Sequence, residues 1–264
     1  EDRLVKVIVC VKQTPDTAAN LTVVGGKASW GDAPLVLNPW DEYAIEQALR
    51  TKEAHGGSVT AISLGPEAAK DSLKQALAMG CDEAVLLSDP AFERADSLVA
   101  SAALAAAIKR IDASDLVFFG KAAVDTDTGV TGPQVARRLG WPSLNLVAAI
   151  SELDPAAKTI TVERLLEEGR QIVRSPLPAV VSVVKEINEP RYPSFMGIRK
   201  ASKAEIPVWT ATEIGLLPVP EPALSWPEVT APARTEQSCE FMSGETAQQQ
   251  AAALVDRLIE EKLI

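Results

Sequence analysis

The sequence predicts an α/β fold with a doubly wound, mostly parallel sheet, an added β segment and a C-terminal arm. Strands and helices alternate at a spacing of about 25–35 residues as far as Gly140. After Gly140 several strands follow one another at turn spacing, which favours an antiparallel addition. Beyond Ile214 prolines interrupt the chain repeatedly, before a final amphipathic helix.

The composition limits the class of protein. The chain has 264 residues, of which 47% are hydrophobic and 23% charged, as in an ordinary globular protein. Its net charge of −10 disfavours nucleic acid and anionic lipid as partners. Cys10, Cys81 and Cys239 form no disulfide or zinc pattern. We expect no signal peptide, no direct membrane insertion and a reducing, cytoplasmic setting.

The first elements follow from local patterns. Leu4–Val11 is apolar and rich in valine, which predicts a buried strand, and Lys12–Asp16 breaks it. The stretch from Leu21 to Leu37 is typical of a small hairpin. A helix is expected next, because Asn38 can cap it and Pro39 suits its first turn.

The alternation continues to Gly140. Further buried strands are expected at Ser58–Leu64, Glu83–Leu87 and Leu116–Phe119. The helices between and after them are expected to end at Met79 and to span Asp96–Ile111 and Thr131–Leu139. This order requires right-handed crossovers between parallel strands.

Three loops follow strand ends and should meet in one crevice, because ligands of doubly wound folds bind beyond the carboxyl ends of the strands. They are Lys12–Asp16, Leu64–Pro66 and Gly120–Gly129. The stretch Gly120–Gly132 also opens a helix, so its backbone N–H groups and threonine hydroxyls can form an anion cradle. A plain capping loop rich in Asp and Thr explains the same residues equally well.

Several kinds of chemistry find no support. No Gly-Lys-Ser/Thr closes the Gly120–Gly132 stretch, and Lys12–Asp16 lacks the glycines of a dinucleotide fingerprint. Asp125 and Asp127 are only a weak candidate for Mg²⁺ binding. The one histidine, His55, is expected in a surface loop between a helix and a strand, which argues against a His-based triad and a site with several His ligands.

The C-terminal half begins with strands at Leu144–Leu153, Thr159–Leu165, Arg170–Arg174 and Ala179–Val184. Asn188–Pro193 is expected to form a rigid exposed loop. The proline-rich stretch Ile214–Arg234 suits neither a compact helix nor a central strand. Gly244–Leu263 is an amphipathic helix, which docks on its own domain or, as we favour, on a partner chain.

Six segments in register resemble the beta subunit of electron transfer flavoprotein, over almost the whole chain. They are Val9–Gln13, Asn38–Asp41, Ala76–Gly80, Gly120–Gly132, Leu177–Val180 and Asn188–Tyr192. The resemblance implies an adenine-nucleotide-binding, Rossmann-like domain over residues 1–213. Residues 214–264 would be a strap and helix that dock on an alpha subunit.

The same resemblance implies the cofactors. FAD would be held mainly by the alpha subunit, and AMP would have a structural role in this chain, which makes it an electron carrier subunit with no catalytic residue of its own. The residues implied to bind AMP are Cys10, Asn38, Pro39, Trp40, Asp41, Leu64, Gly120, Lys121, Ala122, Ala123, Val124, Asp125, Thr126, Asp127, Thr128, Gly129, Val130 and Thr131.

The stretch 191–203 resembles the recognition loop that anchors partner dehydrogenases. The implied partners are flavin dehydrogenases and a quinone-linked oxidoreductase. Phe195 stands where the family often has an anchoring leucine, unless its side chain folds back on its own domain. The residues implied to bind partners are Arg191, Tyr192, Phe195, Lys200 and Lys203.

The sequence departs from the family in three places. Phe195–Ile198 replaces Leu-Pro-Asn-Ile, and Thr17 stands where an aromatic residue can approach the flavin. In Val130–Pro133 the threonine is like AMP-binding members, whereas Gly-Pro is like electron-bifurcating members, in which a second FAD replaces AMP. A stand-alone nucleotide-hydrolysing or sensing domain and a pure interaction module are the hypotheses from other classes.

Overall fold

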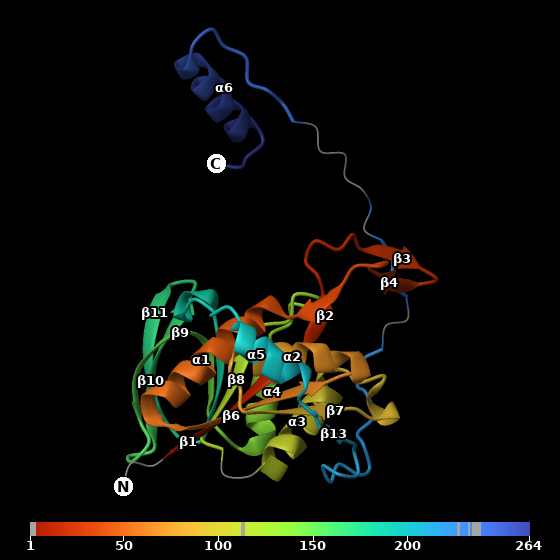
Figure 1. Ribbon diagram of the computed structural model, residues 1–264. Coiled ribbons are helices and arrows are strands. Elements are labelled where there is room, and N and C mark those ends of the chain that lie inside the picture. Colours follow the sequence, from red (N-terminus) through yellow and green to blue (C-terminus); the bar gives the residue numbers. More distant parts are fainter. Residues whose placement is uncertain (1–3, 112–113, 226–227, 232, 234–238) are drawn as a thin grey trace.

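The computed structural model describes residues 4–111, 114–225, 228–231, 233 and 239–264. Its centre is a sheet of nine strands in the order β11-β10-β9-β12-β8-β1-β6-β7-β13. The strands that pair in parallel at its centre are β1 (Val5–Val11), β6 (Gly57–Leu64), β7 (Glu83–Leu87), β8 (Leu116–Gly120) and β12 (Ala179–Val183) (Figure 1). The predicted α/β class with a mostly parallel sheet is confirmed.

Helices cover both faces of this sheet. Residues of α1 (Pro39–His55) and α2 (Lys70–Met79) share one core with alternate residues of β1. Residues of α3 (Ser97–Ile111) and α4 (Thr131–Leu139) share the other core with the residues in between. Because successive side chains of a strand point to opposite faces, a strand buried on both sides must be apolar throughout. This is why β1 is an almost unbroken apolar run.

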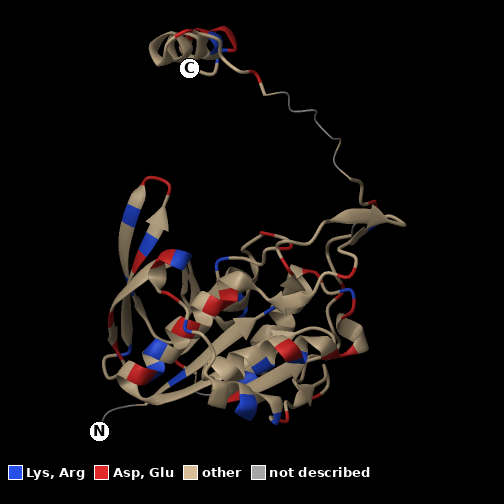
Figure 2. Ribbon diagram, turned by 45° about the horizontal axis from the view of Figure 1, so that its top comes forward, with Lys and Arg blue, Asp and Glu red and all other residues tan. Residues whose placement is uncertain are grey.

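The added β segment extends the sheet on one side. β9 (Ser143–Asp154) pairs in parallel with β12 and antiparallel with β10 (Thr159–Leu166), which in turn pairs antiparallel with β11 (Gly169–Pro176). The turn between β10 and β11 carries Glu167 and Glu168 and forms an acidic tip, while basic residues lie on the strands (Figure 2).

Two of the expected elements need correction. The stretch 21–37 is not one hairpin: β3 (Thr22–Val24) and β4 (Lys27–Ser29) pair with each other, but β5 (Leu35–Leu37) pairs with β2 (Gln13–Pro15), inside the expected break. His55 is the half-buried last residue of α1, so its assignment to a surface loop was wrong. The glycine pair that follows it has positive φ angles, and it is there that the helix ends.

The loop expected over 191–203 is largely a helix, α5 (Phe195–Ser202). The hydroxyl of Ser194 accepts a hydrogen bond from the N–H of Gly197 at 3.0 Å and caps it. A side chain at Gly197 would collide with the carbonyl oxygen of Ala78, so glycine lets α5 lie directly against α2. The helix was missed because its apolar residues face outward and give no core pattern.

The chain after α5 returns to the sheet. β13 (Val208–Trp209), which the sequence did not predict, pairs in parallel with β7 as the ninth strand. Short 3-10 helices η1 (Glu67–Ala69), η2 (Pro90–Phe92) and η3 (Lys185–Ile187) complete the body. Within the described part of 214–234 there is neither helix nor strand, as predicted.

The last element is α6 (Ala247–Glu260), close to its predicted range. Thr246 and Gln249 form a capping box at its start. No residue of α6 is buried, and the apolar side chains of Leu254, Val255 and Ile259 are about half exposed. In the described ranges, none of the helices combines the length and the apolar character that a membrane span requires.

Candidate functional site

A cavity of about 950 Å³ lies beyond the carboxyl ends of the central strands. The chain runs from β1 to β6 and β7 on one side and then returns to β8 on the other side of β1, so the strand order reverses at β1. Ligands of open α/β sheets bind at such a switch point. All three loops expected to converge contribute to the lining, through Lys12, Leu64–Pro66 and the Gly120–Gly129 stretch.

Asn38, at the start of α1, binds the Gly120–Gly129 loop and so connects two parts of the cavity lining. Its side-chain amide donates to the carbonyl oxygen of Ala122 at 2.9 Å and accepts from the N–H of Val124 at 3.1 Å. Asn38 is the N-cap residue of α1 and Pro39 lies in its first turn, as predicted, but the Asn38 side chain makes no hydrogen bond to that turn. An amide side chain offers donors and an acceptor side by side and can pair with a peptide backbone. Asn38 therefore shapes the start of the Gly120–Gly129 loop.

Asp41, in the first turn of α1, connects α1 to the ends of β1 and β8. Its carboxylate accepts hydrogen bonds from the N–H of Lys12 at 2.8 Å and of Gly120 at 3.3 Å. Burial raises the pKa of this carboxyl to about 7, and the bonds from Lys12 and Gly120 oppose that rise. Burial, and then the nearby Asp41, raise the pKa of the Cys10 thiol far above its usual range. Cys10 is thus a neutral lining residue, not a nucleophile.

The Gly120–Gly129 loop offers donors for an anion. Asp127 and Gly129 have positive φ angles of 45° and 62°, which turn the loop back toward the start of α4. No side chain in the described residues caps α4, so its first N–H groups remain available to a ligand. The ammonium of Lys12, which lines the cavity, lies 2.6 Å from a carboxylate oxygen of Asp125, which does not.

The cavity brings together most, but not all, of the residues expected there. It is lined by Cys10, Asn38, Asp41, Leu64, Gly120, Lys121, Ala122, Ala123, Thr126, Thr128, Gly129 and Thr131. The expected residues outside the lining are Pro39, Trp40, Val124, Asp125, Asp127 and Val130. Two lysines, three threonine hydroxyls and an uncapped helix start form a donor set that suits a phosphate group. The residues present therefore fit a nucleotide.

Trp40 lies instead on a neighbouring cavity of about 550 Å³. The ammonium of Lys121, which lines both cavities, is 5.3 Å from the centre of the Trp40 ring. The start of the Gly120–Gly129 loop and the first turn of α1 thus lie between the two cavities.

Sequence reasoning missed one wall of the larger cavity. It is formed by Ser88–Pro90 after β7, by Asp96 and Ser97 at the start of α3, and by Leu224 from the C-terminal arm. The first part could have been found, because β7 was predicted and its carboxyl end belongs to the same edge of the sheet. Nothing local in the sequence marks Leu224.

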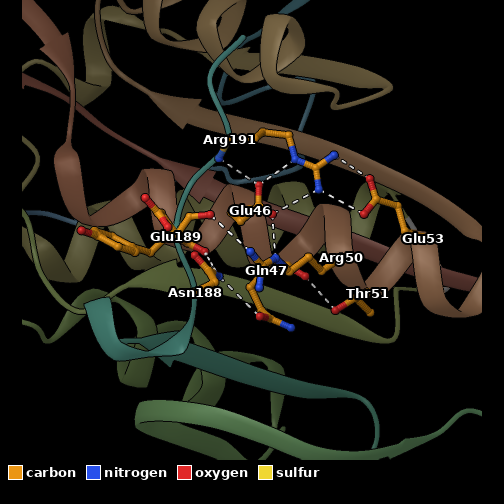
Figure 3. A network of polar contacts seen from close by, with 9 residues as sticks. Glu46, Gln47, Arg50, Thr51, Glu53, Asn188, Glu189 and Arg191 are labelled. Atoms are coloured by element: carbon orange, nitrogen blue, oxygen red, sulfur yellow. Dashed lines mark hydrogen bonds and ion pairs between the residues drawn. The ribbon is translucent and has the colours of Figure 1, made fainter. Parts of the chain in front are cut away.

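The five residues expected to bind partners differ in their exposure and contacts: four are exposed, and Arg191 is bound within the chain. Tyr192 and Phe195 are 96% and 80% exposed, and Lys200 and Lys203 are exposed near them. Arg191 instead points toward α1, where its guanidinium pairs with Glu46 and Glu53 at 2.7 and 2.5 Å (Figure 3). Its side chain is therefore committed within the chain, although it lies beside the exposed residues.

Asn188 and Glu189 attach the same segment to α1. The amide of Asn188 donates to the carbonyl oxygen of Tyr43 at 3.0 Å, and Arg50 donates to the carbonyl oxygen of Glu189 at 3.3 Å (Figure 3). Helix α1 thus has two roles. Its start lines the cavity, and its later turns bind the segment that leads into α5.

Residues 31–214 match the family described as the electron transfer flavoprotein domain. The chain is 42% identical to an electron transfer flavoprotein subunit beta of Clostridium acetobutylicum, over 79% of each chain. It is 39% identical to the protein FixA of Azorhizobium caulinodans, over 80% of this chain and 76% of that one. It is 37% identical to the caffeyl-CoA reductase-Etf complex subunit CarD of Acetobacterium woodii, over 98% of this chain and all of that one.

These matches cover most of the cavity, the segment before α5 and, for CarD, the arm as well. The chain therefore belongs to the electron transfer flavoprotein family, as one of its beta subunits.

Proposed function

We propose that this chain pairs with an alpha subunit that holds most of an FAD, and that it binds AMP in the 950 Å³ cavity. The observation that carries the proposal is the cavity itself, whose lysines, threonines and uncapped helix start suit the phosphate of a nucleotide. When bound, FAD supplies the redox chemistry of the heterodimer.

In this proposal the residues of the chain act as a clamp. Thr126, Thr128 and Thr131 bind the phosphate together with the start of α4, and Lys12 exchanges its contact with Asp125 for the phosphate. Asn38 and Asp41 keep the loops in place through their backbone bonds. A structural AMP would then stabilise the heterodimer rather than react.

The proposed partners contact two separate surfaces. The exposed residues Tyr192, Phe195, Met196 and Ile198 would anchor flavin dehydrogenases, with Lys200 and Lys203 beside them. Residues 214–264 would dock on the alpha subunit, which would cover the apolar face of α6. Electrons would pass from the dehydrogenases to a quinone-linked oxidoreductase, with the heterodimer in the cytoplasm.

A second candidate is an electron-bifurcating assembly in which a second FAD takes the place of AMP. The size of the cavity favours it, because about 950 Å³ lies at the upper end of the range of roughly 300–1,000 Å³ for small-molecule sites. The relative CarD, named as part of a caffeyl-CoA reductase complex, is aligned over its whole length. The adenylate half of the ligand is common to both candidates.

The test is to purify the heterodimer, denature it and count the released nucleotides. One FAD and one AMP per heterodimer support the proposal, and two FAD with no AMP support the second candidate. A heterodimer without flavin absorbance contradicts both. A stable monomer that binds and hydrolyses ATP would instead support a nucleotide-hydrolysing domain.

A further inference from the structure

Two aspartates on the rim of the cavity each hold two parts of the chain at once. We call residues 210–224, which run from the end of β13 into the arm, the rim segment. Asp96 accepts the N–H groups of Leu98 and Val99 with one carboxylate oxygen, at 3.0 and 2.9 Å, and so caps α3. Its other oxygen accepts the N–H groups of Ala223 and Leu224, at 2.8 and 3.1 Å.

Asp89 has the same double role at the other end of the rim segment. One oxygen caps η2 by accepting the N–H of Ala91 at 2.9 Å, and the other accepts the N–H of Ala211 at 3.0 Å. Asp89, Asp96 and Leu224 all line the cavity. The rim segment is therefore fixed at both ends to residues of the cavity wall.

A carboxylate in the lining of an anion-binding cavity should weaken binding, because its negative charge repels a phosphate. Its presence there therefore needs an explanation. The hydrogen bonds to α3 and the rim segment keep the pKa of Asp96 below its usual range, so it is ionised at neutral pH. Its negative charge thus persists where a nucleotide is expected. The hydrogen bonds that Asp96 accepts from the N–H groups of Ala223 and Leu224 explain why a carboxylate is present at this position.

We propose that Asp96 is a positioning residue of the nucleotide site: it holds Leu224 as a wall of the cavity and thereby links nucleotide binding to docking of the arm. This inference rests on the proposed function, since it takes the ligand to be an adenylate and the arm to bind the alpha subunit. Coupling between two sites is reciprocal, so a nucleotide that needs the rim segment in place also favours arm docking. Coupling factors are typically about 5- to 150-fold.

The test measures AMP binding to the nucleotide-free heterodimer by calorimetry, for wild type and Asp96→Ser. Serine caps α3 with its single oxygen but has no second acceptor for the rim segment. We expect AMP to bind about tenfold more weakly, the order of a typical coupling factor. Removal of the charge alone would instead tighten binding, so the direction of the change separates the two explanations.

Glu93→Gln is the matched control. Glu93 also lines the cavity, and among the described residues its side chain has no hydrogen bond or ion pair. Glu93→Gln removes a negative charge from the lining but no bond to the rim segment, so it should tighten AMP binding, opposite to the effect expected of Asp96→Ser. Leu224→Ala removes the wall at a side chain that is 61% exposed, so it should weaken AMP binding without unfolding the chain.

A second readout is independent of the calorimetry. In wild type, saturating AMP should slow the dissociation of the alpha subunit, and in Asp96→Ser this effect should disappear. The inference is overturned if Asp96→Ser binds AMP as tightly as wild type or more tightly, whatever the effect of Leu224→Ala. If wild-type heterodimer binds no AMP and carries two FAD, the same comparison is made with release of FAD. If it binds neither nucleotide in this cavity, the proposed function itself fails.

Discussion

Asp41 is an ionisable residue that is enclosed by the walls of the cavity and carries two of their backbone bonds. A charge in this position is costly because burial removes its hydration, whereas the two N–H donors favour the ionised form. Burial dominates, which places the pKa of Asp41 at about 7. The cavity therefore contains a group that titrates near neutral pH.

This pKa predicts how stability depends on pH. Between about pH 4, the ordinary carboxyl pKa, and pH 7, the folded state binds more protons than the unfolded state, so the free energy of unfolding falls as pH rises. The loss is at most about 1.4 kcal/mol per pH unit and ends above pH 7. Denaturant unfolding at pH 5 and pH 7.5 measures it against Asp41→Asn, which does not titrate. If wild type gains stability relative to Asp41→Asn toward pH 7.5, the assignment is wrong.

Gly120 shows how closely the residues around Asp41 are packed. A β-carbon there would lie 2.5 Å from the carboxylate of Asp41 and 2.7 Å from the backbone of Trp40. Gly120→Ala must displace one of them, so we expect a loss of about 1–3 kcal/mol in denaturant unfolding. Gly132→Ala is the control, because its β-carbon would meet only an ordinary contact with Phe119 at 3.4 Å. Equal effects of the two substitutions would refute the steric explanation.

At the scale of elements, α1 connects the cavity to the exposed segment before α5. Its first turn carries Asp41, and its later turns carry Glu46 and Glu53, which bind Arg191 (Figure 3). Glu46 is only 3% exposed, and although burial raises its pKa, the bonds from Arg191 and Arg50 bring it below the usual range. Helix α1 thus anchors the segment before α5 to the α/β domain through Arg191.

Arg191→Lys tests this attachment. A lysine has the charge but not the planar fork that reaches Glu46 and Glu53 together, so one carboxylate loses its partner. We expect the free energy of unfolding to fall by about 1.5–3 kcal/mol, the value of hydrogen bonds to charged groups. Arg199→Lys, at an exposed site on α5, should change it by less than about 0.5 kcal/mol. If both variants unfold like wild type, Arg191 does not hold the segment.

At the scale of the whole molecule, the chain combines a packed α/β domain with a C-terminal helix, α6, that has no buried residue. Leu254, Val255 and Ile259 are exposed on α6, although its capping box and its periodicity are those of a stable helix. A group of exposed apolar side chains on one helix marks an interaction surface. This is the basis for our proposal that the arm docks on the alpha subunit.

Ile259→Glu separates folding from assembly. Because Ile259 is 55% exposed, the isolated chain should keep its free energy of unfolding within about 0.5 kcal/mol. Affinity for the alpha subunit, measured by calorimetry, should fall at least about tenfold, as for a side chain at the centre of an interface. Gln250→Lys, on the side of α6 opposite Ile259, keeps a donor for the carbonyl oxygen of Gly244 and should change neither quantity. Deletion of residues 218–264 that leaves the heterodimer intact would refute a docking role for the arm.

Local patterns predicted most of the fold and three walls of the cavity. Apolar runs of valine and isoleucine marked most of the central strands, and the prolines and glycines between them marked the ends. The tendency of ligands to bind at strand ends was then enough to predict that three distant loops converge. Some elements were missed, among them α5 and β2. The large apolar residues of α5 are exposed and β2 is only three residues long, so neither gives a pattern that distinguishes it from a loop.

The sequence by itself determined the α/β class, the parallel centre of the sheet and the edge at which the cavity lies, because burial imposes a periodicity on neighbouring residues. Only the tertiary structure decided that Asn38 binds the Gly120–Gly129 loop, that Arg191 turns inward to α1, and that Asp96 holds Leu224 at the cavity. Each of these contacts joins residues at least 84 positions apart. Such pairs leave no periodic trace in the chain, because they depend on how the elements pack.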